Sequence, residues 1–425
     1  MKIYIEPEQK DWPLLLKRPV INALDLEKKV RRILSKVEEK GDKAVRKYTK
    51  EFDGAKLKDL RVSARTIQQS GDQLSDELKQ AIRQAASNIR RFHEAQWQEP
   101  VLIETMPGVK CWRKSVGIEK VGLYIPGGTA PLFSTILMLG IPAVVAGCKE
   151  VILCSPPNRE GELHPAILYA ASVVGISTIF RCGGVQAIGA MAYGTESIPK
   201  VDKIFGPGNQ FVTCAKQLVQ QQGVAIDMPA GPSEVAVYAD HTAVPAYVAA
   251  DLLSQAEHGA DSQVLLVTSD KTIADAVQAA IQSQLQSLPR KAIAEKALLN
   301  SRALVIADRE RALQLLNQYA AEHLILSVDK AAELAQSVVN AGSVFIGNYS
   351  PESVGDYASG TNHTLPTNGY ARAYSGVSVD SFVKKITFQE LDQKGLEAIG
   401  SIVESMAVAE GLEAHANAVR VRRLQ

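Results

Sequence analysis

The chain has 425 residues, a length that corresponds to roughly two or three domains and allows large buried cores. Its 47 basic and 46 acidic residues give a formal net charge of +1. Proteins that bind nucleic acids are typically strongly basic, so this charge argues against that class. Hydrophobic residues make up 46% and charged residues 22%, so the composition is that of a globular protein and not of a disordered chain.

The first hundred residues are rich in charge. Apolar positions recur at helical spacing within residues 24–50 and 64–96, for example at Val30, Ile33 and Val37. This spacing predicts amphipathic helices. Gly41 and Gly54 are the expected breaks between them.

A long uncharged run follows, over residues 121–148. It is long enough to span a bilayer. No basic cluster flanks it, however, and glycines and prolines divide it into pieces of strand or helix length. The run therefore predicts a buried strand, a loop and a buried helix, and no membrane partner. The dividing residues are Gly127, Gly128, Pro131, Gly140 and Pro142.

From residue 120 onward, short β-branched or apolar runs alternate with helical stretches in a first series. Strands followed by helices of about ten or more residues predict a parallel sheet with helices on its faces. The predicted strands are 120–125, 150–154, 177–180, 203–205 and 224–226. The predicted helices are 132–146, 165–174, 186–192 and 210–220.

A second series of the same kind follows. Its predicted strands are 234–238, 264–268, 303–307, 323–326 and 343–346, with helices at 243–255, 272–285, 310–320 and 331–340. The two series predict two similar α/β lobes with mostly parallel sheets.

The composition of the chain changes after the second series. Residues 348–379 form a long polar segment rich in Gly and Tyr, which we expect to be a functional loop. Residues 387–425 are predicted to be a helical tail, of a kind that often packs on another subunit. We divide the chain into an N-terminal arm (1–20), a larger α/β domain (21–120 with 235–376), an inserted lobe (121–234) and the tail (377–425).

Three glycine-containing turns lie in the inserted lobe, at residues 124–129, 182–186 and 205–209. Each lies where a predicted strand ends and a helix begins, which is where ligands of open α/β sheets bind and where backbone N–H groups can hold a phosphate. None has the G-x-G-x-x-G pattern, and any one of them could be only a tight turn. Three in one lobe favour a cofactor cleft.

A few polar residues stand out in the second half of the chain. Gln255 and His258 close a predicted helix on one face, a spacing that suits two ligands of one metal but is also typical of a solvated helix end. Glu322 and His323 begin an apolar strand and are weak candidates for an acid/base pair. Asp356 lies in the long loop.

Two further candidates, Glu410 and His415, lie in the predicted tail, where the ordinary expectation is a surface position.

The five cysteines are an odd number without a C-x-x-C pair. They predict reduced, buried thiols in a cytoplasmic protein, and no disulfide framework or thiolate zinc site. The N-terminus lacks an apolar signal-peptide core, so export is not expected. The cysteines are Cys111, Cys148, Cys154, Cys182 and Cys214.

Together these motifs resemble those of the histidinol dehydrogenase family, in order and over nearly the whole chain. The matching strings are Tyr124-IPGGTAPLFST, Phe205-GPGN, Asp227-MPAGPSE, Ser254-QAEHGADSQ, Ala321-EHL, Gly355-DYASGTNHTLPT and Glu410-GLEAHANAV.

The resemblance implies an NAD-dependent enzyme with one Zn²⁺ per subunit. Such an enzyme oxidises L-histidinol through L-histidinaldehyde to L-histidine with two NAD⁺, as the last step of histidine biosynthesis. It also implies two Rossmann-like lobes and an intertwined homodimer with a shared active site. The small molecules L-histidinol and NAD are then the expected partners, with no nucleic acid.

The resemblance also assigns residues. By it, the acid/base pair is Glu322 and His323. The metal ligands are Gln255, His258, Asp356 and His415, the last from the other chain. The NAD contacts are Tyr124, Gln186 and Asn209. The substrate contacts are Ser233, Gln255, His258, His323, Asp356, Glu410 and His415.

These assignments make chemical sense. A Gln/His/Asp/His ligand set suits zinc, or manganese in its place, without thiolates. The imidazole of His323 titrates near neutrality and suits the removal of a hydroxyl proton while hydride leaves for the nicotinamide. Glu322 is the natural group to activate the water needed for the second oxidation.

Three alternatives stay open at the level of sequence. A metal-dependent hydrolase could use the same ligands with metal-bound water as the nucleophile. A relative could oxidise another small amino alcohol or a hydroxylated sulfonate with NAD. A non-catalytic protein could keep the fold alone, although the presence of every expected ligand argues against it.

Overall fold

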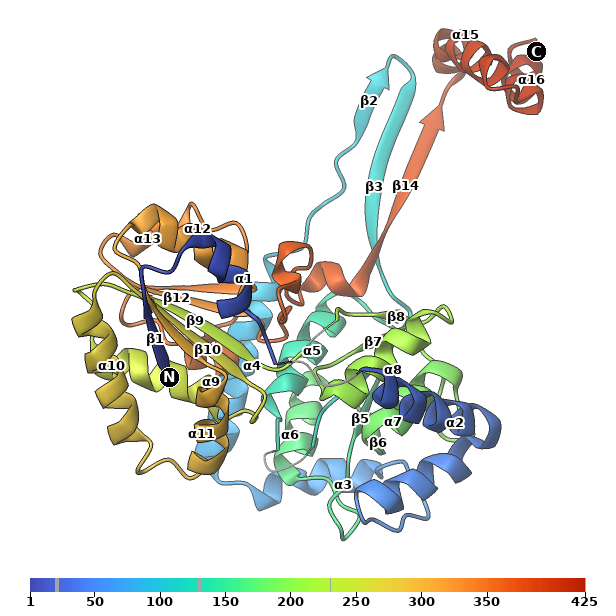
Figure 1. Ribbon diagram of the computed structural model, residues 1–425. Coiled ribbons are helices and arrows are strands. Elements are labelled where there is room, and N and C mark those ends of the chain that lie inside the picture. The colour runs from blue at the N-terminus through green and yellow to red at the C-terminus, as the bar shows by residue number, and fades with distance from the viewer. Residues whose placement is uncertain (20–22, 128–130, 230, 425) are drawn as a thin grey trace.

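The computed structural model describes residues 1–19, 23–127, 131–229 and 231–424. Two α/β lobes lie side by side, and a three-stranded arm that ends in two helices projects away from them (Figure 1). The sequence-based prediction of two α/β lobes with mostly parallel sheets, N-terminal helices and a helical tail is confirmed.

One lobe is built on a five-stranded parallel sheet with the order β6-β5-β4-β7-β8. The predicted first series of elements is confirmed to within a few residues. Since β4 and β7 are neighbours, the chain reverses direction across the sheet between them. The strands are β4 (Lys120–Tyr124), β5 (Glu150–Ser155), β6 (Thr178–Arg181), β7 (Lys203–Phe205) and β8 (Ala225–Ile226), and the helices are α5 (Ser134–Val145), α6 (Pro165–Val174), α7 (Gly184–Tyr193) and α8 (Gln210–Gln220).

The uncharged run supplies the centre of this lobe. It contains α5 and all of β4 except Lys120, and nearly every described residue of these two elements is buried. Hydrophobic burial inside the protein accounts for the missing charges. Among the described residues, no helix is both long enough and apolar enough to cross a membrane.

The other lobe is built on a six-stranded sheet with the order β1-β11-β10-β9-β12-β13, in which every pairing is parallel. The second predicted series is confirmed, although α13 is shorter than expected and α11 was not predicted. The strands are β9 (Glu234–Ala239), β10 (Gln263–Thr268), β11 (Arg302–Val305), β12 (His323–Ser327) and β13 (Ser343–Ile346), with helices α9 (Pro245–Ala256), α10 (Lys271–Gln284), α11 (Lys291–Leu299), α12 (Arg309–Tyr319) and α13 (Ala331–Ala335).

The first residues of the chain belong to this second sheet. The strand β1 (Lys2–Ile5) pairs with β11 at the sheet edge, and the short helix α1 (Trp12–Leu15) buries Trp12 against the lobe. Four residues are too few for a recognisable period, so the strand β1 was not predicted from the sequence.

The N-terminal helices pack on the five-stranded lobe. Helix α2 (Ala23–Phe52) lies on α7 and α8, and α4 (Asp76–Glu94) lies on α5. Between them come α3 (Ala64–Gln68) and a 3-10 turn. The predicted break at Gly41 is present, since Gly41 has a φ of +47° that interrupts the helical backbone of α2.

The projecting arm is an antiparallel sheet of β2 (Ile103–Met106), β3 (Val109–Gly117) and β14 (Val383–Leu391). The prediction of helix from residue 387 onward is wrong for residues 387–391. These residues pair with β3, and Phe388 stacks on Trp112 with ring centroids 5.3 Å apart. The tail helices follow as α15 (Gln393–Ala409) and α16 (Glu413–Arg423).

The polar segment of residues 348–379 is largely irregular, as predicted, but it also contains α14 (Glu352–Tyr357). This helix packs on α9. The segment thereby brings Asp356 to the second lobe.

Candidate functional site

The amino ends of β9 and β12 place the predicted acid/base residues. These strands are neighbours in register, with His323 opposite Val235. Helix α9 runs back along the sheet after β9, so its carboxyl end lies at the same edge. Glu322, His323 and Gln255 therefore come together at the amino edge of the six-stranded sheet.

His323 is fully enclosed and held from two sides. Its Nδ1 atom lies 3.2 Å from the backbone oxygen of Glu234, and its Nε2 atom lies 3.2 Å from Oδ1 of Asp356. Burial lowers the pKa of His323, but the carboxylates of Glu322 and Asp356 outweigh this effect and raise it to about 10. The titration near neutrality expected from the sequence is therefore wrong for His323 beside these two carboxylates. Because a carbonyl oxygen only accepts, Nδ1 carries a hydrogen and Nε2 is the nitrogen left for proton exchange.

Glu322 lies beside His323 in the same buried position. The backbone N–H of Glu234 donates to its Oε2 atom over 2.9 Å, and that oxygen lies 3.7 Å from Nδ1 of His323. Burial raises the pKa of Glu322, while the charge of His323 opposes the shift. Glu322 is therefore a stronger base, when ionised, than an exposed carboxylate.

The start of β9 is fixed by an ion pair from the N-terminal segment. Arg18 donates to the buried carboxylate of Glu234, with an Nε–Oε1 distance of 2.5 Å. The backbone N–H of Asn368 donates to the same carboxylate over 2.7 Å. Ser233, a predicted substrate contact, directly precedes this anchored residue.

Three of the predicted metal ligands lie close to His323. Gln255 is almost fully buried near the end of α9, and its Oε1 atom has no hydrogen-bond partner in the described part of the chain. His258 follows the end of α9 and is exposed in the single chain. Neighbouring groups that keep water from its ring lower the pKa of His258, and the charge of Asp356 opposes this shift. Burial would raise the pKa of Asp356, but the hydrogen bond to His323 and nearby histidines lower it.

These three residues fit a metal in one respect. An amide oxygen that is buried without a partner is costly, and a bound cation would supply the partner. Within the described ranges, no group of three or more His, Cys, Asp or Glu side chains is arranged to hold a metal. Of the ligands predicted to come from the same chain, only His258 and Asp356 belong to these residue types, because the third is Gln255.

The remaining predicted residues are far from this cluster. Glu410 ends α15 and His415 lies on α16, and both are exposed. The arm carries these helices away from both lobes (Figure 1). One chain therefore brings together the predicted residues of the second lobe, but not Glu410 or His415.

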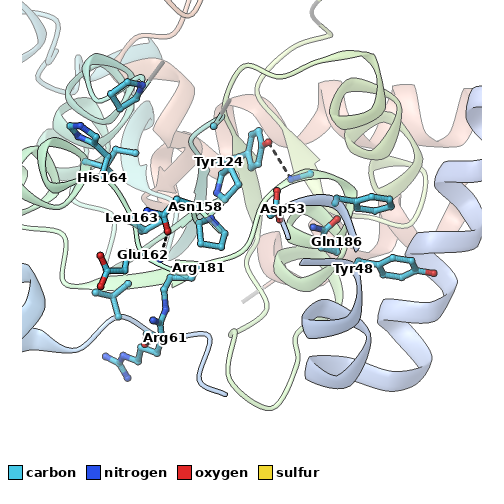
Figure 2. A pocket seen from close by; sticks show the side chains of 18 of the residues that line it. Tyr48, Asp53, Arg61, Tyr124, Asn158, Glu162, Leu163, His164, Arg181 and Gln186 are labelled. Carbon is cyan, nitrogen blue, oxygen red and sulfur yellow. Dashed lines mark hydrogen bonds between the residues drawn. The ribbon is translucent and has the colours of Figure 1, made fainter. Parts of the chain in front are cut away.

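A large cavity of about 1320 Å³ opens at the carboxyl ends of the strands of the five-stranded sheet. The predicted NAD contacts Tyr124, Gln186 and Asn209 all line it, from β4, α7 and the start of α8. Figure 2 shows Tyr124 and Gln186 in the cavity wall. The backbone N–H of Gly184 donates to the Tyr124 hydroxyl over 3.2 Å. The cavity lies where the chain reverses direction between β4 and β7, the usual ligand position in such sheets.

The predicted glycine turns form part of the cavity wall. Gly206 has a φ of +135°, and a Cβ there would overlap the backbone oxygen of Tyr124, so only glycine fits. Asn209 caps α8 by accepting from the N–H groups of Phe211 and Val212. Of the first turn, Gly128 and Thr129 lie outside the described residues, as does Ala130 of the same motif.

The model of the histidinol dehydrogenase family matches residues 16–423, which is nearly the whole chain. The chain belongs to the histidinol dehydrogenase family. It is 58% identical over 422 residues to histidinol dehydrogenase of Bacteroides thetaiotaomicron, with 99% of each chain covered.

More distant members of the histidinol dehydrogenase family and a solved structure agree with this placement. Identity to the Escherichia coli protein is 53% over 411 residues, covering 96% of this chain and 94% of the relative. The crystal structure of histidinol dehydrogenase from Elizabethkingia anophelis superposes with a TM-score of 0.97 at 57% identity, covering 99% of this chain and 98% of that one.

Other residues around the site had no signal in the sequence. His363 bridges the lobes: its Nδ1 atom lies 2.8 Å from the backbone oxygen of Asp356, and its Nε2 atom lies 3.1 Å from Oγ1 of Thr135 at the start of α5. Glu352 is buried and accepts from Ser254 over 2.5 Å. These contacts depend on where the segment of residues 348–379 folds, which local patterns do not specify.

All five cysteines are free, as predicted. Cys154 and Cys182 are buried and the other three are partly buried. Burial raises the pKa of Cys148 to about 11, which is opposite to the shift that activates a thiol.

Proposed function

We propose that this protein is an NAD-dependent oxidoreductase that converts L-histidinol to L-histidine through L-histidinaldehyde, the last step of histidine biosynthesis. Membership of the histidinol dehydrogenase family supports the reaction class. The observation that carries the proposal is the buried pair of Glu322 and His323, one acid and one base within 3.7 Å. The adjoining lobe offers a cavity large enough for a dinucleotide, which favours oxidation over hydrolysis.

His323 is the proposed base for the substrate hydroxyl. The Glu234 carbonyl fixes its ring and occupies Nδ1, so Nε2 receives the proton as hydride leaves for the nicotinamide. The negative charge of Asp356 stabilises the imidazolium that results. The proton transfer therefore creates no uncompensated charge in the buried site.

Glu322 is the proposed base for the second oxidation. An aldehyde yields a hydride only after water has added to it, and that water must lose a proton. Burial makes the Glu322 carboxylate a better acceptor of this proton. No cysteine is required, since the acid forms through a hydrate and not a thioester.

We propose that one Zn²⁺ per subunit is held by Gln255, His258 and Asp356, with His415 from a second copy of the chain. The partnerless oxygen of Gln255 supports this assignment. Bound there, the ion would anchor the imidazole and amine of histidinol. Ser233, His323 and Glu410 would complete the substrate contacts.

We further propose a homodimer, supported by the apolar surface of the tail. Ile402, Met406, Val408 and Leu412 are between 44% and 61% exposed, although they are large hydrophobic residues. An exposed apolar stripe on a projecting element is typical of a protein interface. Docking of the tail on a second copy would bring Glu410 and His415 to that copy's site. The free thiols favour a cytoplasmic location.

The test is NADH formation by the purified chain with L-histidinol and NAD⁺. We expect two NADH for each histidinol consumed, and a loss of turnover after chelation that added zinc restores. A ratio of one would remove the second oxidation from the proposal. Consumption of substrate without NADH would contradict the oxidoreductase assignment and favour a hydrolase.

A further inference from the structure

Asp53 places a carboxylate in the wall of the large cavity. It directly follows α2, and its Oδ2 atom is buried and lacks a hydrogen-bond partner in the described part of the chain. Burial raises its pKa to about 6. A buried carboxylate with no donor is costly, so a ligand that brings donors would be favoured there.

Two further polar groups face the same corner of the cavity. Gln186 is almost fully buried, and both atoms of its amide lack partners among the described residues. The Tyr124 hydroxyl accepts from Gly184, so its own hydrogen is free to donate. Figure 2 shows Asp53, Gln186 and Tyr124 gathered at one side of the cavity. Together they offer both acceptors and donors to a single ligand group.

The chemistry of this corner suits a diol better than a phosphate. Each hydroxyl of a ribose donates one hydrogen bond and can accept others, which matches a carboxylate beside an amide and a phenol. A phosphate brings acceptors only, and its charge would repel Asp53 most strongly where solvent is excluded. Five basic residues also line the cavity. Four of them are exposed, so water screens their charges: Lys29, Arg32, Lys47 and Arg61. The fifth, Arg181, is half-buried, and its guanidinium already donates to the backbone oxygens of Asp59, Arg61 and Gly161.

The position of Asp53 indicates which ribose it would meet. The nicotinamide must reach His323, and the contact between the lobes runs through His363 and Thr135 at the start of α5. Asp53 is instead at the end of α2, which packs on α7 and α8. Helices α5 and α6 form a separate core with α4. Asp53 thus lies on the side of the cavity remote from the acid/base pair, where the adenosine end of the dinucleotide would lie.

We propose that Asp53 accepts hydrogen bonds from the 2′- and 3′-hydroxyls of the adenosine ribose and thereby selects NAD over NADP. This inference rests on the proposed use of a nicotinamide dinucleotide. The 2′-phosphate of NADP would remove one donor and place a charge against the carboxylate. In many dinucleotide-binding lobes a carboxylate from the sheet has this role; here it comes from the helix that precedes the lobe.

The experiment compares Asp53→Asn with the wild-type chain by calorimetric titration of NAD⁺ and NADP⁺. Asparagine keeps the size of the side chain, removes its charge and supplies a donor to a phosphate. We expect NAD⁺ to bind about tenfold to a hundredfold more weakly, and the preference for NAD⁺ over NADP⁺ to fall by at least as much. Glu38→Gln, which changes an exposed carboxylate on α2 that does not line the cavity, should change neither affinity more than about twofold.

Thermal unfolding of the ligand-free variants separates binding from folding. Asp53→Asn removes a partly buried charge, so it should unfold at the wild-type temperature or above, whereas a purely structural role predicts a loss. If the wild type binds NAD⁺ and Asp53→Asn keeps the wild-type preference for NAD⁺ over NADP⁺, the inference about Asp53 is wrong and the proposed function still stands. If the wild type bound neither dinucleotide, the proposed function would fail and the inference with it.

Discussion

At the scale of single residues, the site is organised by backbone groups as much as by side chains. The oxygen of Glu234 holds Nδ1 of His323, and the N–H of the same residue holds Glu322. Both contacts come from the first residue of β9, which Arg18 anchors. The start of one strand therefore orients both members of the proposed acid/base pair.

The first residue-scale prediction concerns Glu322→Gln, which preserves shape but cannot take a proton. We expect oxidation of L-histidinaldehyde to fall by about 10²–10⁴-fold, and oxidation of L-histidinol to the aldehyde to fall much less. Single-turnover measurements with each substrate separate the two steps. Equal losses in both would contradict the role given to Glu322.

The second prediction concerns His323→Asn. Both oxidations need a base at this position, so both should slow by about 10²–10⁴-fold. Zinc content should stay near that of the wild type, because His323 is not among the proposed ligands. Loss of zinc in this variant, measured by elemental analysis, would instead make His323 part of the metal site.

The residues that the sequence could and could not identify differ in a physical way. Glu322 and His323 stand at the start of an apolar strand, and Gln255 with His258 closes a helix, so local pattern indicates them. Glu352 and His363 make contacts with distant parts of the chain, and Asp53 is set into the cavity wall by the packing of α2 on the lobe. Their positions depend on tertiary packing, which local sequence patterns do not report.

At the scale of elements, the parallel strands were predictable because they are buried on both faces and appear as apolar runs. The arm was not. Its strands β2, β3 and β14 are exposed or half-buried except at Val109 and carry many charges, and β14 pairs with β3 across more than half of the chain. Such long-range pairing leaves no local period, so residues 387–391 were mistaken for part of a helix.

Helix α9 carries a prediction about pH. Burial raises the pKa of Asp251 on this helix to about 7, from an ordinary value of 3.8. Between these values the folded chain binds more protons than the unfolded chain, so this group makes stability fall as pH rises. Asp251→Asn should therefore be more stable than the wild type at about pH 8, by roughly 1–4 kcal/mol, and the difference should vanish below about pH 4.

Urea unfolding at several pH values measures this effect. Asp72→Asn, which replaces an exposed carboxylate, serves as the matched control and should show little change at any pH. If Asp251→Asn were less stable than the wild type at about pH 8, the carboxylate would have a partner that offsets its burial.

The contact between the arm and the tail carries a second prediction at this scale. Gly395 in α15 lies so close to Gly108, in the turn between β2 and β3, that a Cβ would overlap the Gly108 backbone. Alanine normally stabilises a helix by about 1 kcal/mol relative to glycine. Gly395→Ala should nevertheless destabilise the arm and tail by about 1–3 kcal/mol, because backbone must move.

Gly400→Ala, in the same helix, is the control for this substitution. Its Cβ would meet only the flexible side chain of Arg423, so helix propensity should dominate and stability should hold or rise. Unfolding in urea and the rate of proteolysis within the tail report on both variants. A Gly395→Ala protein as stable as Gly400→Ala would show that the close contact is not important.

At the scale of the whole molecule, the two lobes carry different parts of the proposed site. The cavity lies at the carboxyl edge of one sheet, whereas the proposed acid/base pair lies at the amino edge of the other. Thr135 and His363 connect them. Only the arm carries residues outward, and it holds Glu410 and His415 on helices that contact neither site within the chain (Figure 1).

This arrangement predicts complementation between inactive variants. If His415 serves the site of a second copy, a heterodimer of His258→Asn and His415→Asn chains has one site with both histidines intact and one with neither. Random pairing makes about half of all dimers heterodimers, so a co-expressed mixture should regain about a quarter of wild-type activity. A mixture of His258→Asn and Asp356→Asn should regain none, because both residues come from the same chain and every heterodimer site lacks one of them. Mass spectrometry of the intact dimers would verify that heterodimers form; with heterodimers present, an inactive first mixture would place His415 outside the site.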